Sequence, residues 1–328
     1  MYRPDRYRYE RLPYDRLGYS GLLVPPLSLG LWHNFGGAAS FDKCREMVLG
    51  SFDLGITHFD LANNYGPPPG SAETMLGKIL KSDLKPYRNE LLIATKAGYD
   101  MWPGPYGNFG SRKYMLSSLD DSLSRLGLDY VDIFYHHRPD PQTPIEETMG
   151  ALDSAVRSGK AMYVGLSNYN ATQLKAARAI LKEMKTPFVA NQIRYNMFDR
   201  SAENELVQTA EVLGIGLFVY SPLAQGLLTD RYAQGIPADS RAGGNSVFLN
   251  KEDISRDVMQ KVRALSRLAA QRGQSLAQLA LAYVLRHSSV SSVIIGASNL
   301  QQIQDCYRVV ENMLLSAREL EEIDLILQ

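Results

Sequence analysis

Three side chains that could cooperate in acid–base chemistry stand in one part of the sequence. Asp60 and Tyr65 lie in the segment GITHFDLANNYG, and Lys96 lies in ELLIATKAG. A tyrosine hydroxyl is a weak acid, with a reference pKa of about 10, and a nearby ammonium group favours its ionised form. An aspartate beside the lysine would keep that ammonium charged and oriented. We therefore expect Tyr65 to donate a proton, Lys96 to lower the pKa of Tyr65, and Asp60 to hold Lys96.

A histidine could complete this group. The segment YVDIFYHHRPD places His136 and His137 side by side on an extended stretch, where neighbouring side chains point to opposite faces. Only one of them can therefore join the site. A neutral histidine could hydrogen-bond a substrate carbonyl, and with Tyr65 it would suit reduction of that carbonyl by a hydride carrier. Each residue alone is more often structural, and only their joint position indicates a function.

The elements that must position these residues are parallel strands. Short apolar runs alternate with amphipathic helices, and the predicted strands are Leu27–Gly30, Ile56–Asp60, Leu91–Lys96, Val131–Tyr135, Met162–Ser167, Phe188–Gln192, Gly216–Tyr220 and Ser292–Gly296. Eight βα units in about 300 residues predict a (β/α)8 TIM barrel, whose active site lies at the carboxyl ends of the strands. We expect residues 1–328 to form a single domain. An N-terminal hairpin (Tyr14–Leu17 with Leu22–Val24) and an extra C-terminal helix would complete it.

Local patterns support the barrel over an open sheet. A doubly wound sheet predicts G-x-G-x-x-G after its first strand, whereas this chain has GLWHNFGG there. Gly104, Gly107 and Gly110 recur instead in the loop after the third strand, which favours a flexible loop. Capping boxes predict helix starts at Thr143 with Glu146 (Pro144 at the first helical position), Asn170 with Gln173, Ser275 with Gln278, and Ser316 with Glu319.

Composition narrows the classes of partner. The chain has 35 basic and 35 acidic residues, which gives no reason to expect nucleic acid or an acidic membrane as partner. It has no apolar run of about 18 residues, and its polar, aromatic N-terminus does not resemble a secretory signal. Cys44 and Cys306 lack metal-ligand spacing, so we expect a reduced, cytoplasmic protein without a metal.

Six segments together resemble the aldo-keto reductase superfamily: GITHFDLANNYG, IATKAG, FYHHRPD, VGLSN, NQIRYN and SPLAQGLLTDRY. The most similar branch contains potassium-channel β-subunits and bacterial L-glyceraldehyde 3-phosphate reductases. MWPGPYGNFGSRKY and GIPADSR resemble the reductase group. The resemblance implies Tyr65 as general acid and Lys96 and Asp60 as its support. Through the HRPD motif, it implies His137 rather than His136 as the residue that orients the carbonyl. It also implies homotetramers or homo-octamers.

The resemblance further implies an NADP-type cofactor extended across the barrel mouth, and a small aldehyde substrate such as glyceraldehyde 3-phosphate or methylglyoxal. Amide and hydroxyl groups at strand ends suit a carboxamide, and a tyrosine face suits a nicotinamide ring. The expected cofactor-binding residues are Trp32, Asp60, Ser167, Asn168, Gln192, Tyr220, Ser221, Leu223, Gly226, Arg231, Arg241, Gly296, Ser298 and Gln302. The expected substrate-binding residues are Trp32, Tyr65, Trp102 and His137.

Charged positions refine these expectations. Arg231 and Arg241 align with phosphate-contacting positions of similar proteins, and an arginine fork matches a 2′-phosphate. Many relatives carry arginine where this chain has Asn299 and asparagine where it has Cys306, so one possible 2′-phosphate partner is lost here. A second group of basic residues could bind a phosphorylated aldehyde or could equally be solvated: Arg112, Lys113 and Arg138.

Two other functions stay open at this point. A protein similar to the channel β-subunits could sense NADP redox state with little turnover, although His137 stands where those subunits carry asparagine. A Schiff-base aldolase on the same barrel would use Lys96 as its nucleophile, which requires a neutral, desolvated amine. Asp60 beside Lys96 argues against that chemistry.

Overall fold

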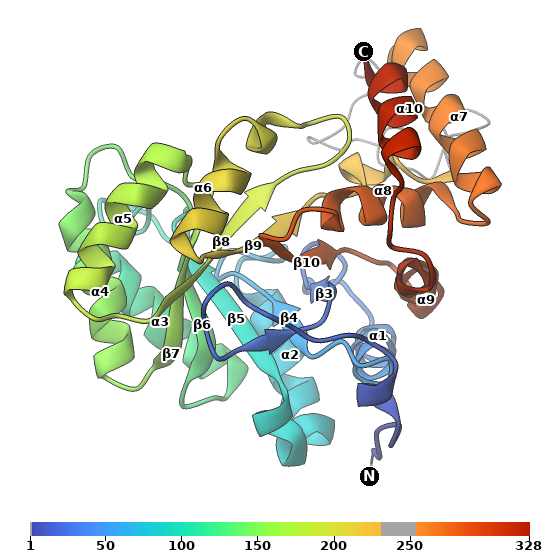
Figure 1. The fold of residues 1–328 in the computed structure, drawn as a ribbon. Helices are drawn as coiled ribbons and strands as arrows, with labels where there is room; N and C mark the ends of the chain where they lie inside the picture. Colours follow the sequence, from blue (N-terminus) through green and yellow to red (C-terminus); the bar gives the residue numbers. More distant parts are fainter. Residues whose placement is uncertain (1, 231–253) are drawn as a thin grey trace.

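Eight parallel strands form a closed barrel at the centre of the molecule (Figure 1). The computed structural model describes residues 2–230 and 254–328. The barrel strands are β3 (Leu27–Gly30), β4 (His58–Asp60), β5 (Leu92–Ala97), β6 (Val131–His136), β7 (Ala161–Ser167), β8 (Phe188–Arg194), β9 (Gly216–Tyr220) and β10 (Val290–Ile295). Each follows its neighbour around the barrel, and β10 closes onto β3. The predicted (β/α)8 barrel is confirmed, and every predicted strand overlaps an observed one.

Helices surround the barrel and cover the outer faces of the strands (Figure 1). They are α1 (Phe41–Asp53), α2 (Ser71–Ile79), α3 (Arg112–Leu126), α4 (Ile145–Arg157), α5 (Ala171–Glu183), α6 (Leu206–Leu213), α7 (Arg256–Gln271), α8 (Leu276–Leu285), α9 (Leu300–Tyr307) and α10 (Ala317–Leu327). The extra C-terminal helix is confirmed as α10. A second additional helix, α7, lies between β9 and α8 and packs against α10. In the described ranges, no helix is both long enough and apolar enough to span a bilayer.

The helix starts follow the capping prediction at three places out of four. Reciprocal capping boxes are present at Asn170, Ser275 and Ser316. The box predicted at Thr143 is wrong, because α4 begins at Ile145 with Pro144 as its N-cap and no side-chain cap bond. Thr143 belongs instead to the preceding turn, where its backbone N–H donates to a carboxylate oxygen of Asp140 at 3.2 Å.

A hairpin covers the amino-terminal mouth of the barrel. Its strands are β1 (Asp15–Arg16) and β2 (Leu23–Val24), which confirms the predicted hairpin. Leu17, between them, is fully buried and packs in one cluster with Phe218 and Ile294 of the barrel interior. The backbone N–H of Tyr19 donates to the carbonyl of Gly214, just before β9, at 2.8 Å. The hairpin therefore lies opposite the end at which barrel enzymes place their active sites.

The barrel interior contains a short polar chain below that end. His58 on β4 bonds through Nδ1 to the Ser28 hydroxyl of β3 at 2.8 Å, and Ser28 bonds to Ser292 of β10 at 2.7 Å. All three side chains are fully buried. Burial lowers the pKa of His58 to about 4, so this histidine is neutral at physiological pH.

Candidate active site at the carboxyl ends of the strands

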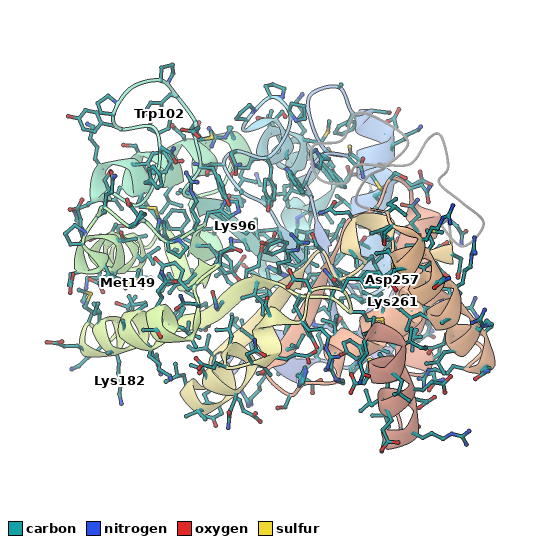
Figure 2. All side chains as sticks on the ribbon, turned by 90° about the horizontal axis from the view of Figure 1, so that it is seen from above. Lys96, Trp102, Met149, Lys182, Asp257 and Lys261 are labelled. Atoms are coloured by element: carbon teal, nitrogen blue, oxygen red, sulfur yellow. The ribbon has the colours of Figure 1, made fainter. Side chains whose placement is uncertain are left out.

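Lys96 stands at the centre of the candidate site and is fully buried on β5. Its Nζ donates to Asp60 Oδ2 at 2.6 Å, to the Leu61 carbonyl at 2.6 Å and to the Tyr65 hydroxyl at 3.4 Å. An ammonium group has three hydrogens, so these acceptors use all of them. Figure 2, which views the molecule from above, places Lys96 in the middle of the molecule. The predicted grouping of Asp60, Tyr65 and Lys96 is therefore present in the structure.

Asp60 is fixed from two sides of the barrel. One carboxylate oxygen accepts from Lys96, and the other accepts from the Gln192 side-chain amide at 2.8 Å. Gln192 lies on β8, far from β4 around the barrel, and is 2% exposed, as is Asp60. Lys96 and Gln192 are both hydrogen-bond donors, so each oxygen of the Asp60 carboxylate has a partner although the side chain is buried.

Tyr65 lies in the loop after β4, with its ring beside the Lys96 ammonium, 4.8 Å from Nζ to the ring centroid. Burial raises the pKa of Tyr65 well above its ordinary value, and the charge of Asp60 adds to this rise. The lowering of the Tyr65 pKa by Lys96 stays a prediction, and the net shift in this structure is upward because loss of hydration disfavours the phenolate. Burial also lowers the pKa of Lys96, although Asp60 opposes that shift. Tyr65 is thus a protonated phenol at neutral pH.

The two adjacent histidines point to opposite faces, as predicted. His137 follows β6 and presents its ring edge-on to Tyr65, with 5.9 Å between ring centroids. Burial lowers the pKa of His137 well below its usual value, and the Lys96 charge lowers it further, so the ring is neutral. His136 is buried outside the barrel and bonds through Nδ1 to the Tyr169 hydroxyl at 2.7 Å. Of the two, His137 is the one that shares a site with Tyr65.

Hydroxyl and amide groups at the ends of β7, β8 and β9 form one connected network. Asn168 donates to the His137 carbonyl at 3.0 Å and to the Ser167 hydroxyl at 3.1 Å, and it accepts from the Tyr220 hydroxyl at 2.8 Å. Ser167 donates in turn to the Gln192 carbonyl at 3.1 Å. Four of the residues predicted to hold a nicotinamide therefore lie together on the rim next to Asp60 and His137.

Comparison with known proteins agrees with this arrangement. Residues 26–328 match the model of the aldo/keto reductase family. This chain belongs to the aldo/keto reductase family. It is 50% identical to L-glyceraldehyde 3-phosphate reductase of Escherichia coli strain K12 over 97% of this chain and 93% of that protein. It is also similar to two probable voltage-gated potassium channel β-subunits, at 37% identity in Oryza sativa subsp. japonica and 38% in Arabidopsis thaliana, over 95% of each chain. The chain is accordingly an oxidoreductase.

The loop after β9 in this aldo/keto reductase has an unusual backbone. Ser221, Ala224 and Gln225 have positive φ values of 53°, 46° and 60°, and Gly226 has 100°. Such conformations in residues other than glycine are uncommon and often mark binding loops. The Asn196 side chain donates to the Ser221 carbonyl at 3.1 Å and helps to hold the loop. Of the positions predicted to hold the cofactor, Ser221, Leu223 and Gly226 are described here, whereas Arg231 and Arg241 lie outside the described residues.

The start of α9 contains the last group of predicted cofactor residues. Gly296 and Ser298 are exposed, and Ser298 donates through its backbone N–H to Gln302 Oε1 at 2.9 Å. Asn299 is the N-cap, since its side chain accepts from the backbone N–H of Gln302 at 3.0 Å. Asn299 thus stabilises this helix end. From the sequence, Asn299 was considered only as a position where many relatives carry arginine, and this capping role was not predicted.

The two tryptophans predicted to contact substrate have different surroundings. Trp32 lies near Tyr65, with 5.9 Å between ring centroids. Trp102 packs on Tyr114 at 5.3 Å and lies on an outer loop, well away from Lys96 in Figure 2. A Cβ at Gly107 in that loop would come within 2.0 Å of the Trp102 carbonyl oxygen, so this glycine has a packing role, and the predicted flexibility of the loop stays a prediction. A Cβ at Gly110 would meet His136 and Thr148 at 2.8 Å. These glycines allow close packing.

Two contacts at the site were missed by sequence reasoning. Tyr99, three residues after Lys96, packs edge-on against His137 with 4.7 Å between ring centroids. Gln192 was predicted to contact a carboxamide, but its hydrogen bond to Asp60 was not foreseen. Both contacts join strands or loops that are distant in sequence, and no local spacing pattern reports them.

Proposed function

We propose that this aldo/keto reductase uses NADPH to reduce small aldehydes to alcohols, with glyceraldehyde 3-phosphate or methylglyoxal as the type of substrate. The observation that carries the proposal is the placement of a protonated phenol, Tyr65, beside the buried Lys96 ammonium and a neutral His137. The 50% identity to a protein named L-glyceraldehyde 3-phosphate reductase supports the substrate class.

The residues at the rim fit a nicotinamide cofactor. Asn168 uses both amide hydrogens within the protein, on the His137 carbonyl and the Ser167 hydroxyl. Gln192 uses one amide hydrogen on Asp60, which leaves its other hydrogen and its carbonyl oxygen to pair with a carboxamide. Tyr220 offers a ring face whose orientation is set by its bond to Asn168. When bound there, NADPH supplies the hydride.

The protein residues then act on the carbonyl oxygen of the aldehyde. Tyr65 donates its hydroxyl proton to that oxygen as negative charge develops on it, and the Lys96 N–H at 3.4 Å stabilises the resulting phenolate. His137 donates a hydrogen bond to the same oxygen from Nε2, because its Nδ1 is buried and has no partner among the described residues. Asp60 and the Leu61 carbonyl keep Lys96 in place throughout.

The proposal of NADPH over NADH rests on Arg231 and Arg241, whose planar side chains match a 2′-phosphate. Comparing turnover with the two cofactors checks it. Three further predictions from the sequence stay predictions: a single domain over residues 1–328, a cytoplasmic location, and a homotetramer or homo-octamer. Cys44 and Cys306 are both free and buried, which is compatible with the second of these.

An alternative is a channel-β-subunit-like module that binds NADP and turns over slowly. The similarity to two probable β-subunits favours it. A fast single hydride transfer followed by negligible steady-state turnover would support this alternative over the reductase. A Schiff-base aldolase is disfavoured, because the Lys96 amine is enclosed by three acceptors. Borohydride trapping of an aldehyde on Lys96 would support the aldolase instead.

The direct test follows NADPH oxidation with a panel of small aldehydes in wild type and Tyr65→Phe. We expect the variant to lose about 10²- to 10⁴-fold in kcat, the usual contribution of a general acid. Tyr106→Phe is the matched control, since Tyr106 is 54% exposed and should keep wild-type rates. Full activity in Tyr65→Phe would remove Tyr65 as the proton donor.

A further inference from the structure

Arg138, directly after His137, contacts two aromatic rings. Its guanidinium carbon is 4.3 Å from the ring centroid of Tyr99 and 4.4 Å from that of Phe109. Its Nε donates to the Gly98 carbonyl at 2.8 Å, and its Nη2 donates to Asn108 Oδ1 at 2.7 Å. The flat, forked guanidinium is suited to stack and donate at once. One side chain therefore joins both ends of the loop that connects β5 to α3, residues 98–111, which we call the β5–α3 loop.

Other contacts fix the β5–α3 loop around this arginine. Asn108 donates to Asp100 Oδ1 at 2.5 Å and accepts from the Phe109 backbone N–H at 2.7 Å. Phe109 has a φ of 66°, a conformation rare for a bulky residue. The Gly110 N–H donates to Asp140 Oδ2 at 3.0 Å, which adds a second tie to the segment after β6. These contacts tie the loop to itself and to the segment after β6.

The same loop contacts the proposed active site through Tyr99. Tyr99 meets His137 edge-on, with rings 84° apart and centroids separated by 4.7 Å. At Gly98 the loop backbone runs so close to His137 that a Cβ there would lie 2.9 Å from the His137 Cβ. The orientation of the His137 imidazole therefore depends on where the β5–α3 loop is held.

We propose that Arg138 is a positioning residue, which sets the orientation of His137 by holding Tyr99 and the β5–α3 loop against it. The proposal rests on the proposed role of His137 in carbonyl reduction. The competing role for Arg138 is to bind a substrate phosphate with its charge. Against that role, its guanidinium packs on the rings of Tyr99 and Phe109, and Nε and Nη2 already donate within the protein.

The kinetic test compares Arg138→Lys and Arg138→Met with wild type, using glyceraldehyde 3-phosphate and unphosphorylated glyceraldehyde with NADPH. We expect both variants to lose about tenfold or more in kcat on both aldehydes by similar factors, since small displacements of a catalytic group are costly. Lysine keeps the charge but loses the flat fork that packs on the two rings and donates from Nε and Nη2. NADPH affinity and the thermal midpoint should change little. Lys182→Met removes an exposed charge on α5, far from Lys96 in Figure 2, and should leave both rates unchanged.

A second readout does not depend on turnover. In enzyme with isotope-labelled histidine, the imidazole NMR signal of His137, assigned through His137→Asn, should move in Arg138→Lys, Arg138→Met and Tyr99→Leu. The signal of His58, which lies deep in the barrel, should stay in place in all three. The NMR measurement tests the positioning role of Arg138 even if the enzyme turns over no aldehyde. An absence of turnover would refute the proposed function, and the two results are therefore distinguishable.

Three outcomes would overturn the positioning role. The first is a loss confined to the phosphorylated aldehyde and restored by lysine, which would make Arg138 a phosphate ligand. The second is a lowered thermal midpoint with wild-type kcat in the folded enzyme, which would make it a structural residue only. The third is an unmoved His137 signal in both Arg138 variants.

Discussion

The position and the charge of the Lys96 side chain are determined by the groups around it. Its ammonium group has three acceptors, from a carboxylate, a backbone carbonyl and a phenol, and it has no exposed surface. Burial alone would favour the neutral amine, whereas the 2.6 Å contact with Asp60 favours the ion. The partner that fixes Asp60 in turn is Gln192, so the chain of contacts runs from β8 across the barrel to Tyr65.

Removing the Gln192 amide should weaken this chain measurably. In Gln192→Leu, one oxygen of the buried Asp60 carboxylate loses its donor, which should cost about 1–3 kcal/mol of unfolding free energy. Asp60→Asn and the double variant complete a double-mutant cycle in urea unfolding. If the losses of unfolding free energy in the two single variants sum to the loss in the double variant, the Gln192–Asp60 contact does not contribute to stability. Gln301→Leu, at an exposed position on α9, is the control for the amide-to-leucine change.

At the level of helices and strands, the sequence predicted those features that depend on neighbouring residues in the chain. The strands follow from apolar runs, three of the four predicted helix starts follow from capping residues, and neighbouring parallel strands then bring Asp60, Lys96 and His137 to one rim. Contacts made by barrel closure have no such pattern, so the Gln192–Asp60 bond and the packing of Tyr99 on His137 were missed. The raised pKa of Tyr65 was missed because the extent of burial is a property of the assembled barrel.

Helix α5 gives a clean test of a capping box next to the site. Asn170 accepts from the Gln173 backbone N–H at 2.9 Å, and the Gln173 side chain accepts from the Asn170 N–H at 3.1 Å. Asn170→Ala should lower the free energy of unfolding by about 1 kcal/mol, whereas Asn170→Asp keeps an acceptor and should be near neutral. Denaturant midpoints of the two variants provide the measurement. Equal midpoints for alanine and aspartate would contradict a role for the cap.

For the whole molecule, buried neutral histidines make stability depend on pH. Burial lowers the pKa of both His58 and His136 to about 4 in the folded protein, against an ordinary value of 6.5. As pH falls below 6.5, the unfolded chain binds protons that the native protein does not. Unfolding therefore becomes easier down to about pH 4, where the native histidines also titrate. Each histidine contributes a loss of about 3 kcal/mol over that window.

This dependence can be measured between pH 6.5 and 5. The urea midpoint of wild type should fall across that range, and the fall should be smaller in His58→Asn and His136→Asn. Asparagine keeps a polar atom near the Nδ1 position that bonds Ser28 or Tyr169 but has no proton to gain. If the asparagine variants lose stability with pH as steeply as wild type, these two histidines are not the cause.

The hairpin below the barrel has a consequence for synthesis. The ribosome makes Leu17 and Gly18 before any strand of the barrel, yet Gly18 seats against Gly214 and Gly216, and Leu17 packs with Phe218 and Ile294, which follow much later in the sequence. The hairpin therefore cannot complete its docking until β9 and β10 have emerged. Until then the apolar side chains of the hairpin lack the barrel residues that they pack against, and the amino-terminal mouth of the nascent barrel stays uncovered.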